Sequence, residues 1–170
     1  MPKPGVRQAV NALLELADML GGLILIAVTV LNLVAVFMRY VLVDSLSWSE
    51  EVMRYACIWL TFLAAAAASH HAEHLSLDLM RFRGSPFVQR LHETSLHLLA
   101  SVFAASVLWQ GIRYCIKNGM QTAPSTGILM VWVYGAIAVG GALILIAELT
   151  KAWDVYTGRD DRIQHEDPAL

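Results

Sequence analysis

Apolar residues fill four long stretches of this chain, and polar or charged residues gather between them. The stretches cover residues 19–38, 50–69, 94–112 and 127–147. At about 1.5 Å of rise per helical residue, a stretch of this length crosses a hydrocarbon core of roughly 30 Å. We therefore predict an all-α integral membrane protein with four transmembrane helices, formed as a single domain over residues 1–170.

Polar segments flank the four spans. Residues 1–18 place apolar and polar side chains on opposite helical faces, which predicts either an amphipathic helix in the headgroup region or the first turns of the first span. For the polar segment 70–93 we predict a short interfacial helix, because a lone strand would leave its backbone unpaired beside a membrane. His74 and Asp78 are then i,i+4 neighbours, either contacting a partner or forming a solvated pair. Residues 158–170 form a polar tail.

Composition and charge agree with a membrane protein. Apolar residues make up 57% of the chain and charged residues 15%, against roughly 25% charged in soluble domains. A net charge of −2 argues against a nucleic-acid partner. The two cysteines, Cys57 and Cys115, suggest neither a disulfide framework nor a zinc site.

Loop charge predicts the orientation. With the N-terminus inside, the inner segments hold eight of the 12 basic residues and the outer connections hold four. The outer four are Arg39, Arg54, Arg113 and Lys117. Because cytoplasmic loops are enriched in Lys and Arg, we predict that both termini are cytoplasmic.

The start of the second span carries the most specific polar pattern. Ser47 and Glu50 have the spacing of a capping box, which begins a helix just after Ser47. Glu50 and Glu51 then lie at the positive end of that helix, and Arg54 is close enough along the helix to pair with either. We predict a cluster of Glu50, Glu51 and Arg54, which Arg39 at the end of the first span can join.

Two further features of the first two spans indicate helix contacts. An aromatic and apolar stripe follows at helical spacing, and its members are Trp48, Val52, Tyr55, Trp59 and Phe62. The stripe and the alanine run 64–68 serve either packing within the chain or contact with a partner. Asn32 is a polar amide deep in the first span, so it either faces another helix or bonds within this chain.

No residue set supports catalysis or conduction, and we predict neither an enzyme nor a cofactor site. The central thirds of the four spans lack Asp, Glu, Lys and Arg, which a path for a charged solute normally needs. One alternative stays open: His74, His92 and His97 all fall near the inner face, where two histidines can ligate a haem. The chain would then be a four-helix membrane cytochrome or a membrane anchor subunit of a respiratory complex. Against this alternative, His74 and His92 lie in loop-like sequence.

The ordered set of motifs resembles the DctQ-like family, the small membrane subunits of tripartite ATP-independent periplasmic (TRAP) transporters. The matching elements are Asn32, Arg39-Tyr40, Trp48-x-Glu50-Glu51-x-x-Arg54, Trp59, Phe62, His74-x-x-x-Asp78-Leu79, Pro124 and Gly127. The similarity covers nearly the whole chain. The sequence departs from the family at Ala64, where glycine is common, and at Met130 and Ala138, where proline is frequent.

The resemblance implies a function that composition alone does not. Such a subunit lies in the bacterial inner membrane and scaffolds a large permease subunit, which carries the sodium and organic-anion sites. A periplasmic binding protein delivers the substrate, often a carboxylate such as a dicarboxylate or sialic acid. The residues expected at a partner interface are Asn32, Arg39, Trp48, Glu50, Glu51, Arg54, Trp59, Phe62, His74 and Asp78.

Overall fold

The structure is a computed structural model that describes residues 4–44, 46–71 and 86–157. Its helices are α1 (Pro4–Tyr40), α2 (Ser47–His71), α3 (Pro86–Asn118) and α4 (Met130–Tyr156). All four are long and apolar enough to cross a membrane. The described residues contain no strand apart from one isolated bridge between Thr122 and Leu129. The prediction of an all-α membrane protein with four spanning helices is therefore confirmed.

The helices extend beyond the predicted apolar stretches. α1 begins at Pro4, so residues 4–18 of the amphipathic segment form the first turns of the first span rather than a separate interfacial helix. α3 begins at Pro86, where a proline is tolerated because the first helical N–H needs no partner within the helix. Residues 86–93, the last third of segment 70–93, thus belong to α3. His74, Asp78 and the tail 158–170 lie outside the described residues.

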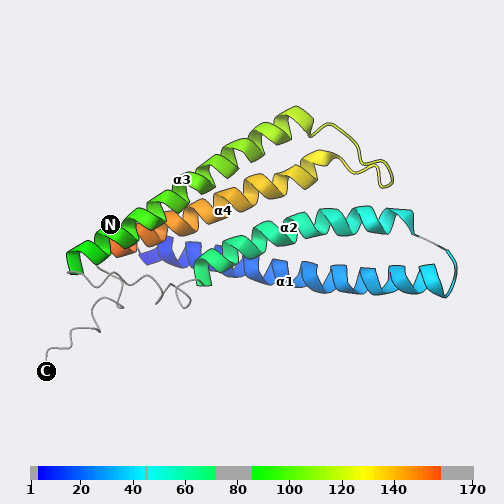
Figure 1. Ribbon diagram of the computed structural model, residues 1–170, viewed down its shortest axis with the longest axis horizontal. Coiled ribbons are helices and arrows are strands. Elements are labelled where there is room, and N and C mark those ends of the chain that lie inside the picture. The colour runs from blue at the N-terminus through cyan, green and yellow to red at the C-terminus, as the bar shows by residue number, and fades with distance from the viewer. Residues whose placement is uncertain (1–3, 45, 72–85, 158–170) are drawn as a thin grey trace, which may run out of the picture.

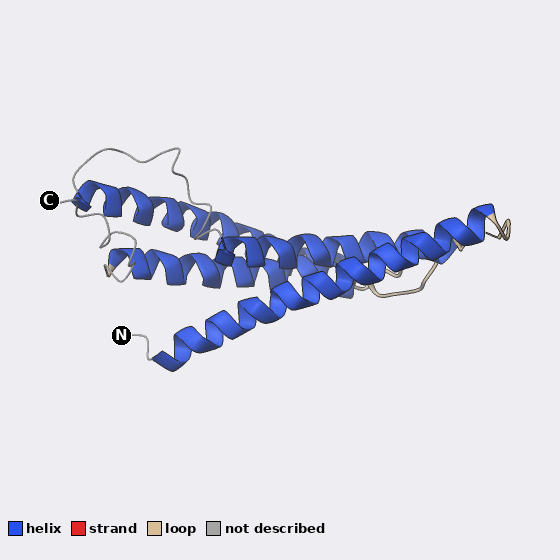
Figure 2. Ribbon diagram, turned by 90° about the horizontal axis from the view of Figure 1, so that it is seen from below, coloured by secondary structure: helices blue, strands red, loops and turns tan. Residues whose placement is uncertain are grey.

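The four helices pack in a row. α2 and α4 lie in the middle, α1 packs on the outer side of α2, and α3 packs on the outer side of α4 (Figure 1). α1 runs obliquely along the other helices and contacts α4 mainly near its own beginning (Figure 2). The most apolar window of α4 is 33% buried, against 17% in both α2 and α3 and 6% in α1. α1 therefore presents most of its apolar surface away from the chain.

Two consecutive glycines place α4 between its neighbours. A Cβ on Gly140 would lie 2.4 Å from the Cβ of Phe62 in α2. A Cβ on Gly141 would lie 2.8 Å from the backbone nitrogen of Leu108 in α3. Small residues allow such close approach of helices in a bilayer.

A compact apolar cluster joins the first part of α1 to the last parts of α2 and α4. Its buried members are Leu14, Ala17, Leu63, Ala66, Leu143 and Ala147. Within the alanine run 64–68, Ala66 and Ala67 are buried and the other three are exposed. The run therefore serves packing inside the chain on one face and leaves the opposite face open.

We expect Gly141→Ala to destabilise the fold, because the added methyl group would collide with the backbone of α3. Overpacking of this kind costs about 1–3 kcal/mol, which should appear as a lower thermal unfolding midpoint of the detergent-purified protein. Gly135→Ala is the matched control in the same helix, because a Cβ there meets nothing within 4 Å. Equal midpoints for the two variants would show that α3 and α4 do not approach this closely.

Candidate functional site

Glu51 joins the beginning of α2 to the connection between α3 and α4. Its side chain lies inside the protein, with only 8% of the residue exposed. Oε1 accepts a hydrogen bond from the Tyr55 hydroxyl at 2.9 Å. Oε2 accepts from the backbone N–H groups of Ser125 at 3.1 Å and Thr126 at 2.8 Å. One carboxylate therefore holds two segments that are far apart in the sequence.

The connection is folded so that its tip reaches Glu51. The Ala123 N–H donates to the Ile128 carbonyl at 2.9 Å, and the Gly127 N–H donates to the Ala123 carbonyl at 3.0 Å. Gly127 has a φ of 68°, a left-handed conformation that glycine adopts without the cost of a side chain. These bonds close the turn and leave the N–H groups of Ser125 and Thr126 for the carboxylate. α4 consequently begins at Met130, after the start predicted at residue 127.

Arg39 and Glu50 form an ion pair that links the end of α1 to the start of α2. Their side chains are 53% and 57% exposed, and exposed pairs contribute only about 0–1 kcal/mol. The predicted capping box is not the arrangement found: α2 starts at Ser47 itself, and the Glu50 carboxylate contacts Arg39. Ser49 instead closes the first turn, with its N–H and its hydroxyl both donating to the Leu46 carbonyl.

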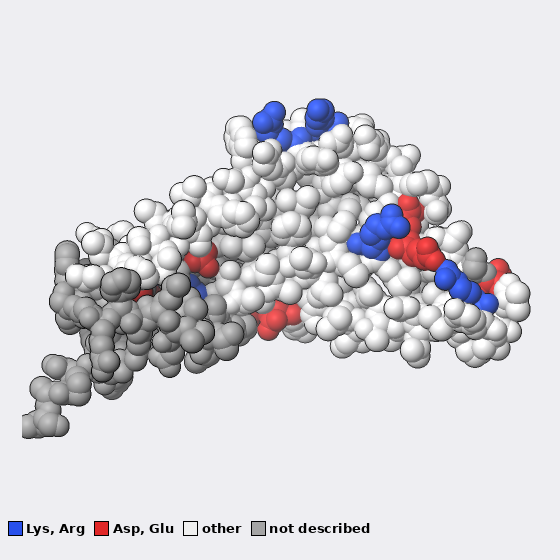
Figure 3. Space-filling model, viewed as in Figure 1, with Lys and Arg blue, Asp and Glu red and all other residues white. Residues whose placement is uncertain are grey.

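The predicted charged cluster is therefore divided. Acidic and basic side chains do gather over the end of α1 and the start of α2 (Figure 3), and Arg39 does pair with Glu50. Arg54 is exposed, and among the described residues it forms an ion pair with neither Glu50 nor Glu51. The reason is that the Glu51 carboxylate points into the protein, where two N–H groups and a phenol already satisfy it.

Some residues of the aromatic stripe contact other parts of the chain, and others are exposed. The Trp59 indole N–H donates to the Trp132 carbonyl at 3.0 Å, which ties α2 to the start of α4. Phe62 packs on Gly140, whereas Trp48 is 44% exposed. An open groove of about 220 Å³ runs between the two helices, lined by Val52, Tyr55, Ala56, Trp59, Ile128, Trp132 and Val133. Trp59 and Phe62 thus serve packing within the chain, and Trp48 remains available to a partner.

Asn32 lies on an exposed part of the α1 surface. Its side chain is exposed, and no hydrogen bond joins its amide to another residue in the described part of the chain. Thr29, one turn earlier, differs because its hydroxyl donates to the Leu25 carbonyl in its own helix at 2.8 Å. The interpretation in which Asn32 bonds within this chain therefore has no support.

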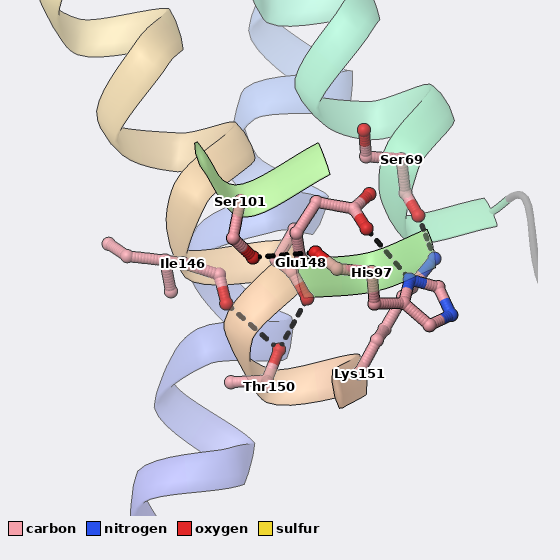
Figure 4. A network of polar contacts seen from close by, with 8 residues as sticks. Ser69, His97, Ser101, Ile146, Glu148, Thr150 and Lys151 are labelled. Atoms are coloured by element: carbon pink, nitrogen blue, oxygen red, sulfur yellow. Dashed lines mark hydrogen bonds and ion pairs between the residues drawn. The ribbon is translucent and has the colours of Figure 1, made fainter. Parts of the chain in front are cut away.

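A second polar network lies toward the opposite ends of the helices (Figure 4). Glu148 of α4 is 8% exposed, and its Oε2 lies 2.8 Å from Nδ1 of His97 in α3. Lys151, one turn further along α4, donates to the backbone carbonyl of Ser69 near the end of α2. Ser101 donates its hydroxyl to the His97 carbonyl at 2.8 Å. The network connects α2, α3 and α4 at one level.

Sequence reasoning missed this network, although its signal was present. Glu148 and Lys151 follow the fourth apolar stretch, and His97 lies near the beginning of the third, so consecutive antiparallel spans bring them to one depth. For the haem alternative, His92 lies in α3 rather than in a loop, His97 contacts Glu148 through Nδ1, and His74 lies outside the described residues. Within the described ranges, no group of three or more His, Cys, Asp or Glu side chains is placed to hold a metal ion.

We expect Glu51→Leu to release the connection between α3 and α4. The amide protons of Ser125 and Thr126 would lose their acceptor, so a peptide covering residues 119–129 should exchange hydrogen for deuterium at least about tenfold faster. Glu50→Leu is the matched control, because it removes only the exposed pair with Arg39. Unchanged protection in Glu51→Leu would mean that the turn holds its shape without the carboxylate.

Comparison with known proteins shows which family this chain belongs to. The model of the family described as "Tripartite ATP-independent periplasmic transporters, DctQ component" matches residues 8–158. A Haemophilus influenzae protein with the provisional name TRAP transporter small permease protein is 25% identical over 131 residues, covering 75% of this chain and 80% of that protein. The Vibrio cholerae sialic acid TRAP transporter small permease protein SiaQ is 20% identical over 117 residues, covering 69% of this chain and 68% of that protein.

A third relative is a much longer protein. The Haemophilus influenzae sialic acid TRAP transporter permease protein SiaT is 24% identical over 131 residues, which cover 77% of this chain but 21% of that protein. The family match extends over most of the chain and includes all four apolar helices. This chain therefore belongs to the DctQ component family of TRAP transporters and is a multi-pass transport protein of the bacterial inner membrane.

Proposed function

We propose that this chain is the small permease subunit of a TRAP-type secondary transporter and that it scaffolds a large permease subunit in the membrane. The large subunit carries the sodium and organic-anion sites. A periplasmic binding protein delivers the substrate, a carboxylate in the class of dicarboxylates or sialic acid. The chain itself contributes contact surfaces and has no catalytic role.

The position of Asn32 is the observation that carries the scaffold role. An amide inside a membrane span needs a hydrogen-bond partner, because lipid offers none. Asn32 is exposed, and the described residues offer it no hydrogen-bond partner. A helix of another protein, packed against this part of the α1 surface, satisfies this amide.

The sizes of the relatives support a larger partner. The region similar to this chain makes up 21% of the SiaT permease of Haemophilus influenzae, so in that protein it shares one polypeptide with a much longer remainder. We infer that the remainder of that protein corresponds to the large subunit that this chain contacts. The charge-free centres of the four apolar stretches agree with this division, since they offer no path for a charged solute.

The end of the bundle that carries Glu51 is suited to meet a periplasmic protein. The Arg39–Glu50 pair, Arg54 and Trp48 are exposed there, beside the turn that Glu51 holds in place. Pre-ordering a turn before a partner arrives lowers the entropy cost of binding. This assignment requires both termini to be cytoplasmic, as the loop charges predict.

Orientation is tested by reporter fusions at the C-terminus and within residues 118–126. We expect a reporter that is active only in the cytoplasm to work at the C-terminus, and one that is active only in the periplasm to work within residues 118–126. This follows from the excess of basic residues in the inner segments. The reverse pattern would contradict both the orientation and the placement of the docking end.

Association with the large subunit is tested at Asn32. We expect Asn32→Leu to weaken co-purification of the large subunit by roughly 3- to 30-fold, the range that follows from the strength of one interhelical hydrogen bond. Uptake of a carboxylate substrate into proteoliposomes should fall with it. Thr29→Val is the matched control, because its hydroxyl is satisfied within α1. If both variants assemble and transport as wild type, the scaffold face lies elsewhere.

A further inference from the structure

A basic groove lies on the outward side of α3, near its C-terminal end. Arg113 and Lys117 are one turn apart, and both side chains are exposed. Together with three neighbours they line an open groove of about 410 Å³; the lining residues are Gln110, Arg113, Tyr114, Ile116 and Lys117. Figure 3 shows basic side chains together at this end of α3, with no acidic side chain beside them on the visible face.

Arg113 and Lys117 differ from Arg39, a basic residue at the same end of the bundle that forms an ion pair. Arg39 has its charge balanced by Glu50. Among the described residues, Arg113 and Lys117 form no ion pair with an aspartate or glutamate. The nearby helix C-terminus favours the cations and provides no donor for an anion. Any attraction for an anion therefore comes from the side chains of the groove.

The groove lies at headgroup depth. Arg113 and Lys117 are in the last turns of the apolar helix Leu91–Asn118, where long basic side chains reach the membrane interface. Trp109, on the adjacent surface, is 65% exposed, as expected for an aromatic belt at this level. Tyr114 packs edge-on against Tyr134 of α4, with ring centroids 5.2 Å apart and an interplanar angle of 76°. One wall of the groove is thereby held in place by α4.

We propose that this groove binds the phosphate group of an anionic phospholipid in the leaflet at this end of the helices. The Arg113 guanidinium can donate two parallel hydrogen bonds to a phosphate, and Lys117 adds a second charge. The Gln110 amide and the Tyr114 hydroxyl are further donors. Beside these groups Ile116 is 78% exposed, which provides an apolar surface for an acyl chain. A lipid matches this combination, whereas a free anion would leave the apolar part uncovered.

The test uses the 170-residue chain purified in detergent, with its native lipids removed. Phosphatidylglycerol and phosphatidylcholine with identical acyl chains are added, and bound lipid is counted by native mass spectrometry. Each basic side chain at a charged interface should contribute roughly fivefold, so we expect wild type to prefer phosphatidylglycerol about 25-fold over phosphatidylcholine. Arg113→Gln and Lys117→Gln should each lose about fivefold, and the double variant should lose the preference.

Two controls test whether positive charge is enough for the preference and whether the ligand is a lipid or a free anion. The double exchange Arg113→Lys with Lys117→Arg keeps both charges and should retain most of the preference. Inorganic phosphate should not displace the bound phosphatidylglycerol; displacement by phosphate alone would assign the groove to a free anion and overturn the proposal.

Two further results would also overturn it. Full preference in the double Gln variant would place the lipid elsewhere. Equal binding of the two lipids by wild type would also overturn the proposal, and this result does not depend on whether the Gln variants fold. If the Gln variants then failed to co-purify with a partner protein, the groove would be assigned to a protein contact.

Discussion

Close approach at two neighbouring glycines of α4 determines how the other helices are arranged. Consecutive helical residues point about 100° apart, so Gly140 and Gly141 open two different faces of the same turn. Phe62 of α2 occupies one face, and the backbone of α3 at Leu108 occupies the other. α4 is thereby placed between α2 and α3, and α1 contacts α4 mainly through the apolar cluster near the beginning of α1. A side chain at either glycine would separate a pair of helices that the rest of the structure requires to be close.

Two buried carboxylates then connect the ends of these helices. Glu51 holds the turn between α3 and α4 against the start of α2. At the opposite ends, Glu148 contacts His97, and Lys151 contacts the last residues of α2 through the Ser69 carbonyl. Buried polar groups that are satisfied specify one arrangement, because displacing them leaves a costly unpaired group. The glycines thus set the distances between the helices, and the carboxylates fix their ends.

The row arrangement leaves two surfaces with different chemistry. α1 exposes a long apolar surface and the Asn32 amide, which has no hydrogen-bond partner among the described residues, and this suits contact with a helix of a larger membrane protein. α3 turns outward a groove with two basic side chains, which suits a phosphate at the membrane surface.

The sequence by itself determined the number and the kind of elements. Four apolar stretches of spanning length can only be helices in a membrane, because every backbone N–H and C=O must be satisfied within its own segment. The Arg39–Glu50 pair was also predictable, since a short connection keeps the end of α1 close to the start of α2. The ordered motifs were enough to suggest the family that the comparison then established.

Only the tertiary structure decided which polar groups meet. Glu51 could have paired with Arg54 along its own helix, but the turn delivers Ser125 and Thr126, 74 and 75 residues later, to the same carboxylate. Glu148 and His97, 51 residues apart, meet for a similar reason. Local spacing shows which side chains can reach one another within a helix. Contacts between helices depend on crossing positions, which Gly140 sets against the Phe62 side chain of α2 and Gly141 against the backbone of α3.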